Sequence, residues 1–223
     1  MTTGAQLESI YRTLLSAFGY RHWWPADTAE EVVIGAILAQ NVAWENARKA
    51  IDQLHQHHLL SLTAIHHIDA ADLAPLIRSS RFYHQKAKRL KNFTSLLFDR
   101  FDGDLDTLFG LDLAPLRKVL INLKGFGPET VDSILLYAAE KPIFVIDAYT
   151  RRIFGRLGVT GADWSYPAYQ DFVMSRLASD VPLFNDFHAQ IVYLGNRICK
   201  KKRPLCPQCP LENQCSGPME SMP

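Results

Sequence analysis

The stretch at residues 123–130 reads Leu-Lys-Gly-Phe-Gly-Pro-Glu-Thr. It lies between two segments whose apolar residues recur at helical spacing, residues 116–123 and 128–139. The proline suits the first turn of the second helix, where its missing N–H is no loss, and the two glycines permit a tight turn. The stretch therefore predicts two helices joined by a short hairpin.

The backbone of this hairpin is a candidate DNA-binding site. N–H groups exposed at Gly125 and Gly127, together with the N-terminus of the following helix, could bind a DNA phosphate. An ordinary helix-turn-helix with glycine caps explains the same two residues, and a Gly-x-Gly motif is weak by itself. The residues after the hairpin must therefore decide between these interpretations.

Asp147 follows the hairpin and precedes a new run of apolar residues at helical spacing. That position predicts an N-cap for a helix beginning at Ala148. A carboxylate can also stabilise the positive charge that builds on C1′ when an N-glycosidic bond is cleaved, and it can orient the attacking water. The two roles are compatible because a carboxylate has two oxygens.

All four cysteines lie near the C-terminus with the spacing C-x6-C-x2-C-x5-C, at Cys199, Cys206, Cys209 and Cys215. Four thiolates in one short segment can enclose a zinc ion or a [4Fe-4S] cluster, and the spacing alone leaves both metals open. Clustering of this kind favours a local metal site in a reduced compartment over a set of disulfides.

The fold class predicted by the periodicity is all-α. Apolar residues recur at spacings of three and four from Leu7 to about Leu136, and the one strand-like run, residues 143–146, is expected to be an extended connector. A length of 223 residues allows one domain or two small ones, and a net charge of +1 means that any basic surface must be local. Without a signal peptide or membrane-spanning run, an intracellular protein that does not enter the membrane is expected.

With hairpin, Asp147 and cysteine tail in this order, the chain resembles the endonuclease III branch of the helix-hairpin-helix DNA glycosylase superfamily, from about residue 30 to residue 215. The resemblance implies two helical lobes: a six-helix barrel with the hairpin at 29–140, and a cluster lobe formed by 1–28 and 141–223. It implies a [4Fe-4S] cluster on the four cysteines. It also implies a monomer that acts on double-stranded DNA with a damaged base, in the cytoplasm or, in a prokaryote, on the nucleoid.

The hairpin departs from one group within that superfamily. The bifunctional members carry a lysine whose amine attacks C1′ and forms a Schiff base, whereas this chain has Glu129 at the matching position. Lys124 lies in the hairpin but not at that position. We therefore expect a monofunctional glycosylase of base-excision repair, in which water attacks beside Asp147 and an abasic site remains.

Three stretches are similar to the 3-methyladenine glycosylase subgroup: residues 23–25, 35–41 and 82–90. The subgroup implies an alkylated purine as substrate, and stacking with cation–π attraction suits its positive charge. Members of that subgroup generally lack the cysteine tail, and their pocket lysine appears here as Gln190. Both departures leave a glycosylase for oxidised, deaminated or mismatched bases, or an inactive DNA-binding module, as alternatives.

The same resemblance implies roles for individual side chains around a flipped base. Trp24 and Trp44 would flank the base, with Glu129 also in the pocket, although core packing is an equal explanation for tryptophans. Gln40 and Phe82 would fill or wedge the gap left in the duplex. Two basic segments could bind phosphates, one with Lys86, Lys88 and Arg89 and the other at residues 200–203.

Overall fold

The computed structural model describes residues 4–161 and 163–217, and within these ranges it contains helices and loops but no strand. The prediction of an all-α fold is confirmed, and residues 143–146 form an extended connector as expected. The chain divides into two compact units, one formed by Trp24–Lys141 and the other by Met1–Trp23 with Pro142–Pro223. The first boundary therefore falls just before Trp24 instead of at residue 29, so Trp24 belongs to the same unit as the hairpin.

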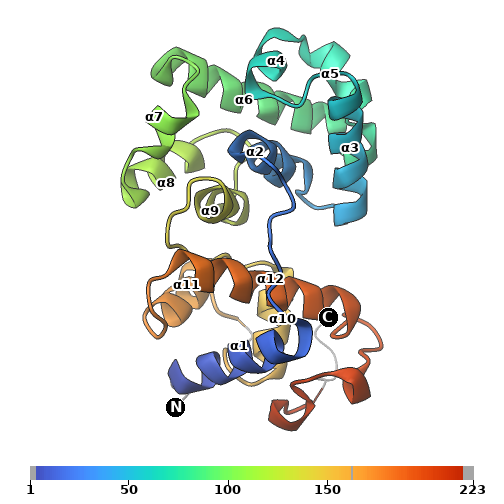
Figure 1. Cartoon of the computed structure of the whole chain (residues 1–223), viewed down its shortest axis with the longest axis vertical. Helices are drawn as coiled ribbons and strands as arrows, with labels where there is room; N and C mark the ends of the chain where they lie inside the picture. The colour runs from blue at the N-terminus through green and yellow to red at the C-terminus, as the bar shows by residue number, and fades with distance from the viewer. Residues whose placement is uncertain (1–3, 162, 218–223) are drawn as a thin grey trace. The chain divides into compact units, whose positions relative to one another are not determined.

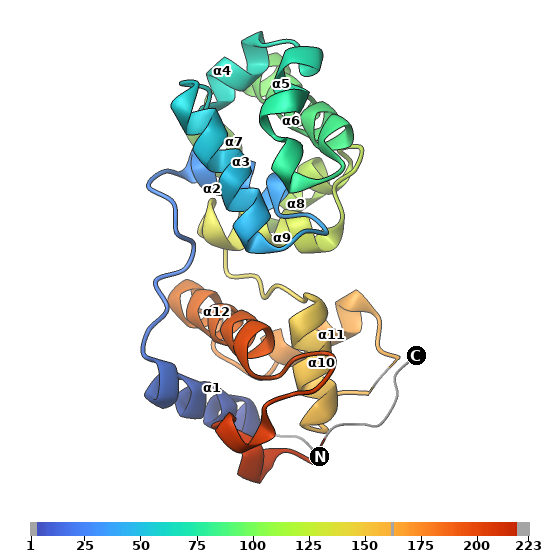
Figure 2. The same ribbon diagram turned by 90° about the vertical axis from the view of Figure 1, so that its right-hand side faces the viewer.

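The unit that contains the hairpin is built around α2, which lies among α3, α6 and α9 (Figures 1 and 2). Every residue from Val32 to Leu38 is buried, because this helix is apolar on all sides and neighbouring helices cover it. The helices of the unit are α2 (Ala29–Leu38), α3 (Trp44–Gln56), α4 (Leu62–His67), α5 (Ala70–Leu76), η1 (Arg78–Ser80), α6 (Tyr83–Phe101), α7 (Leu105–Phe109), α8 (Leu113–Ile121) and α9 (Pro128–Tyr137).

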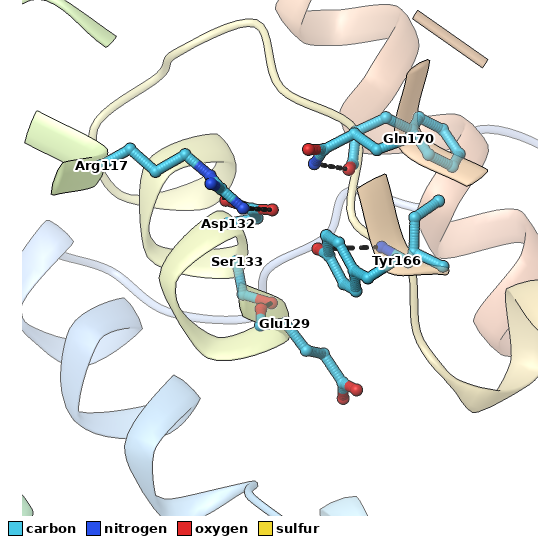
Figure 3. Close-up of polar contacts among 8 residues, drawn as sticks. Arg117, Glu129, Asp132, Ser133, Tyr166 and Gln170 are labelled. Carbon is cyan, nitrogen blue, oxygen red and sulfur yellow. Dashed lines mark hydrogen bonds and ion pairs between the residues drawn. The ribbon is translucent and has the colours of Figure 1, made fainter. Parts of the chain in front are cut away.

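Helices α8 and α9 form the predicted hairpin, and an ion pair ties them together. Arg117 Nε and Nη2 lie 2.7 and 3.1 Å from the two carboxylate oxygens of Asp132, which is fully buried (Figure 3). A bidentate pair of this kind fixes both distance and orientation. Gly125 adopts φ +92° in the turn, where a side chain would be strained. The sequence motif thus folds as a rigid helical hairpin.

The second unit is built around α12, which packs against α1 and α10 (Figure 2). Its helices are α1 (Gly4–Phe18), α10 (Ala148–Arg156), α11 (Tyr166–Met174), α12 (Val181–Arg197), η2 (Cys206–Gln208) and η3 (Glu212–Gln214). Gly195 lets α10 and α12 approach closely, because a Cβ there would lie 2.3 Å from Tyr149 Cδ1. Across residues 4–161 and 163–217, no helix combines the length and apolar character needed to span a membrane.

The connector before α10 is held by side chains of α11. Gln170 Nε2 donates to the carbonyl of Phe144 at 2.7 Å, and the N–H of Ile146 donates to the Tyr166 hydroxyl at 3.3 Å (Figure 3). The Phe144 ring also packs edge-on against Phe184, with 5.6 Å between centroids. These contacts satisfy buried backbone groups that have no strand partner, and they fix the position from which Asp147 emerges.

Candidate active site and cysteine cavity

Asp147 caps α10, as its position in the sequence predicts. Its Oδ1 accepts hydrogen bonds from the Thr150 backbone N–H at 2.7 Å and from the Thr150 hydroxyl at 2.9 Å. The residue is 8% exposed. Both bonds use the same oxygen, so the capping role leaves Oδ2 for another function.

His188 on α12 faces that second oxygen, and sequence reasoning missed it. Its Nε2 lies 3.7 Å from Asp147 Oδ2, and the ring is buried beside Phe144. Burial lowers the pKa of His188, and the nearby Asp147 carboxylate opposes this effect. No spacing in the sequence relates two residues that are 41 positions apart and meet only through the packing of α10 against α12.

The hairpin presents backbone with little obstruction. Gly127 is the N-cap of α9, and a Cβ built on it would meet nothing within 4 Å, so a phosphate has room to approach. Glu129 lies in the first turn of α9 and is exposed, and Figure 3 shows its side chain extending away from the helix. Its backbone carbonyl accepts a hydrogen bond from the Ser133 hydroxyl at 2.7 Å. At position 129 the hairpin therefore carries a carboxylate, whereas the bifunctional members of the superfamily are expected to carry an amine at the matching position.

Both ends of the Gln40 amide are hydrogen-bonded, one end to the hairpin and the other to α6. Nε2 donates to the Thr130 hydroxyl at 2.8 Å and to the Gly125 carbonyl at 3.3 Å, and Oε1 accepts from Arg89. The Arg89 side chain also covers Gly125, where a Cβ would lie 2.5 Å from its Nε. These contacts determine which way the amide faces, because donor and acceptor are both engaged.

Phe82 is the most exposed of the large apolar side chains that stand out on the surface, at 58%. It is the N-cap residue of α6 and has φ 46° and ψ 32°, in the left-handed region. The preceding residue, Arg81, also has a positive φ of 56°. Two consecutive residues of this kind without glycine are strained and are found chiefly where function requires them.

The prediction that Lys86 binds a phosphate is wrong. The residue is fully buried, and its ammonium donates to the carbonyls of Leu38, at 2.7 Å, and Ser80. Burial lowers the pKa of Lys86 to about 8, and the nearby Arg89 charge contributes. Lys88 is exposed and stays a candidate phosphate ligand. Residues two apart on a helix point to different sides, which is why the two lysines differ.

The two candidate base-pocket tryptophans contact each other directly. The Trp24 and Trp44 rings meet edge to face, with centroids 5.2 Å apart and an interplanar angle of 89°. Tyr137 of α9 also contacts Trp24, with 5.5 Å between the ring centroids. The Trp24 indole also packs on Gly35, where a Cβ would lie 3.1 Å from Nε1. Rings in contact leave no slot between them, so a base could be flanked only after one ring rotates.

Gln190, at the position of the subgroup's pocket lysine, is buried within its own unit. Its Nε2 donates to the Gly19 carbonyl at 2.7 Å and to Asp186 Oδ2 at 3.1 Å. Asp186 in turn accepts a hydrogen bond from the backbone N–H of Arg21 at 2.7 Å. This network fastens the end of α1 to α12, so the glutamine has a structural role here.

The four cysteines line one cavity with a volume of about 270 Å³. They are free thiols at Cys199, Cys206, Cys209 and Cys215. Burial raises the pKa of the Cys209 thiol; a hydrogen bond with the Leu211 backbone opposes this effect, and the other three thiols reinforce it. Among the described side chains, no three Cys, His, Asp or Glu are grouped so as to hold a single metal ion. Four of the residues that line the cavity are cysteines, whose thiolates can bind zinc or an iron–sulfur cluster.

Two arginines of α10 hold the start of the cysteine segment, and they too were missed in the sequence. Arg152 donates to the carbonyls of Cys199 and Gly195, each at 2.9 Å. Arg156 Nη1 lies 3.1 Å from Cys199 Sγ and also donates to the Lys200 carbonyl at 2.9 Å. Their spacing of four places them on one helix face, and that spacing is the signal that could have revealed them.

Comparison with known proteins agrees with this architecture. The family model described as HhH-GPD superfamily base excision DNA repair protein matches residues 34–176. A protein of Methanocaldococcus jannaschii that is provisionally named a DNA repair glycosylase is 41% identical over 92% of this chain and 94% of its own length. Endonuclease III of Thermotoga maritima is 27% identical, over 94% of this chain and 92% of that protein.

Two solved structures are similar to the fold described here. The H. pylori 3-methyladenine DNA glycosylase, bound to 1,N6-ethenoadenine, has a TM-score of 0.73 and 26% identity over 87% of this chain and 95% of that one. An endonuclease III in a non-covalent DNA complex has a TM-score of 0.82 and 22% identity, over 97% of this chain and 96% of that one. From its hairpin, its all-helical fold and these likenesses, the chain belongs to the HhH-GPD superfamily of base excision DNA repair proteins.

Proposed function

We propose that this protein is a monofunctional DNA glycosylase that removes an alkylated purine by hydrolysis and leaves an abasic site. The observation that carries the proposal is the carboxylate of Glu129 in the first turn of α9. A lyase reaction through a Schiff base needs an amine at the sugar, and a carboxylate cannot form one. The active residue that we assign is Asp147.

The proposed reaction is attack by water on C1′ of a flipped nucleotide. The bond from C1′ to the base nitrogen breaks and takes its electron pair to the base, while a bond forms from C1′ to the water oxygen. The proton that the water loses goes to the Asp147 carboxylate or to bulk water. Asp147 stabilises the positive charge that develops on the sugar, using Oδ2 because Thr150 occupies Oδ1.

The aromatic group of Trp24, Trp44 and Tyr137 supports an alkylated purine as the substrate. An N3-alkylated adenine is positively charged, so it is attracted to aromatic faces and leaves as a neutral base without prior protonation. The similarity to the 3-methyladenine glycosylase of H. pylori supports the same choice. Since the two tryptophans touch, base binding requires one of them, such as the half-buried Trp44, to rotate.

We assign DNA binding to residues that are exposed or open in the hairpin unit. The open backbone at Gly127 binds a phosphate together with the exposed backbone of Gly125, beside which the Arg89 side chain lies. Lys88 adds a charge that salt will screen. Phe82 enters the gap left by the flipped base, and its exposure and strained backbone support this role. Gln40 fills the gap from the opposite loop, where its contacts with the hairpin orient the amide.

We further propose that the cavity lined by Cys199, Cys206, Cys209 and Cys215 holds a [4Fe-4S] cluster. When bound, this group would cross-link a segment that has little apolar core of its own. Arg156 donates to the sulfur of Cys199 and would offset part of the negative charge of the thiolates. Arg152 fixes the backbone of the same residue to α10.

The distinction between hydrolysis and lyase chemistry has a direct test. A duplex carrying one 3-methyladenine analogue is incubated with the enzyme, and strand breaks are counted before and after alkali, with borohydride trapping in parallel. We expect breaks only after alkali and no trapped adduct. The matched variant Glu129→Lys restores an amine at this position and is expected to give some trapped adduct. Strand scission without alkali by the natural protein would contradict the monofunctional assignment.

The substrate class needs a separate panel of duplexes. These carry an alkylated purine, an oxidised pyrimidine, a deaminated base or a mismatch, and the measured quantity is released free base per enzyme. We expect the alkylated purine to be released fastest. Release of an oxidised or mismatched base alone would reject the alkylpurine assignment while leaving glycosylase activity in place.

A further inference from the structure

Lys86 connects the two loops that carry the proposed gap-filling residues. Its ammonium donates to the carbonyl of Leu38, two residues before Gln40, and to that of Ser80, two residues before Phe82. The lysine is itself fully buried. A buried ammonium is costly to maintain unless acceptors surround it, so its presence between these two loops requires a physical reason.

Both acceptors lie at helix ends. Leu38 is the last residue of α2, and Ser80 is the last residue of η1. Carbonyls in the last turn of a helix lack partners within the helix and carry partial negative charge, so one cation there satisfies two such ends at once. The ends of the two helices are thereby held at a fixed separation.

The loop after Ser80 needs such support. Arg81 and Phe82 both have positive φ, at 56° and 46°, and Phe82 is 58% exposed, so its own side chain packs little against the protein. Strained residues persist only when their surroundings hold them in place. Lys86 contributes at both ends of this turn, because its own backbone N–H donates to the Phe82 carbonyl at 3.0 Å.

We propose that Lys86 is a positioning residue that holds Phe82 and Gln40 at the spacing needed to enter the duplex gap, before DNA binds. Arg89, one turn further along α6, also helps to position Gln40, because it donates a hydrogen bond to the amide oxygen of Gln40. Preorganisation of this kind raises affinity by reducing the ordering that binding must otherwise impose. The inference depends on the gap-filling roles in the proposed function.

The chain offers a matched control in Lys91, which lies on the same helix. Its ammonium donates to the carbonyls of Ile65, at 3.1 Å, and Ile68, at 2.8 Å, and also to that of His66, all at the end of α4. Lys91→Met therefore removes a similar set of hydrogen bonds from a helix end that carries no gap-filling residue. Lys86→Met removes them from the two loops.

The experiment uses a duplex with a tetrahydrofuran abasic site opposite 2-aminopurine, whose fluorescence rises when the base is unstacked. We expect Lys86→Met to weaken binding of this duplex by about tenfold and to reduce the fluorescence rise, with binding of undamaged duplex changed by less than about twofold. Lys91→Met should leave both signals near those of the natural protein. Equal effects of the two substitutions would overturn the inference.

Coupling to Phe82 distinguishes positioning from general destabilisation. In a Phe82→Ala background, Lys86→Met should weaken binding by no more than about twofold further, because the side chain that it positions is gone. If the fold-changes in binding caused by the two substitutions multiply, the substitutions act independently and the inference is refuted. If Lys86→Met does not fold, Lys86→Gln replaces it, because the glutamine amide still donates hydrogen bonds. Lys86→Gln should weaken binding of the abasic duplex less than Lys86→Met and should also reduce the fluorescence rise. An unchanged fluorescence rise would contradict the inference.

The same variants separate this inference from the function on which it rests. If Phe82→Ala alone leaves binding and fluorescence unchanged, Phe82 does not enter the gap and that part of the proposed function fails. If Phe82→Ala lowers both signals but Lys86→Met lowers neither, the proposed function stands and only the role of Lys86 is rejected.

Discussion

Replacement of Asp147 by asparagine tests the proposed catalytic carboxylate with little change to the fold. Asparagine is as good an N-cap as aspartate, so its side-chain oxygen can keep the bonds to Thr150 at 2.7 and 2.9 Å. The negative charge at Oδ2 is lost. A unit charge about 4 Å from a developing cation contributes about 4 kcal/mol at an effective dielectric of 20. We therefore expect base release to slow by about three orders of magnitude.

The assay is single-turnover release of base from a duplex with one alkylated purine, together with binding of the tetrahydrofuran duplex. We expect the rate to fall while binding and the free energy of unfolding change little. Asp180 provides the matched control, because it caps α12 of the same unit through the Leu183 N–H at 2.7 Å. Asp180→Asn should keep the rate of the natural protein. A rate for Asp147→Asn within about tenfold of that value would refute the reasoning.

Three further predictions concern the hairpin, the cysteine cavity and the buried lysine. Gly127→Ala should weaken duplex binding in a gel-shift titration but leave stability within about 0.5 kcal/mol, since a Cβ there meets nothing within 4 Å. Cys206→Ala should lower the iron and sulfide content of the purified protein and its melting temperature. The pKa of Lys86 is about 8 when folded and 10.5 unperturbed, so the unfolded chain binds more protons between these values. Stability in urea should therefore rise by up to about 3 kcal/mol as pH increases through that window, and Lys86→Met should lose this rise.

The elements that the sequence predicted correctly are those set by neighbours along the chain. Helical periodicity, the glycine turn before α9, the N-cap at Asp147 and the extended connector at residues 143–146 all depend on residues a few positions apart. The four cysteines are also close in the chain, and the structure places them around one cavity. Local conformational preference and hydrogen bonding within one turn are sufficient to specify such features.

The tertiary structure decided which side chains are buried and what they meet. Lys86 looked like Lys88 in the sequence, yet the packing of α6 against neighbouring helices buries the first and exposes the second. The contact between Trp24 and Trp44 and the approach of His188 to Asp147 arise in the same way, between residues on different elements. A linear pattern gives the face of a helix on which a residue lies. Which carbonyl, ring or carboxylate covers that face depends on long-range packing, and this packing fixes the charge and accessibility of the side chains in the site.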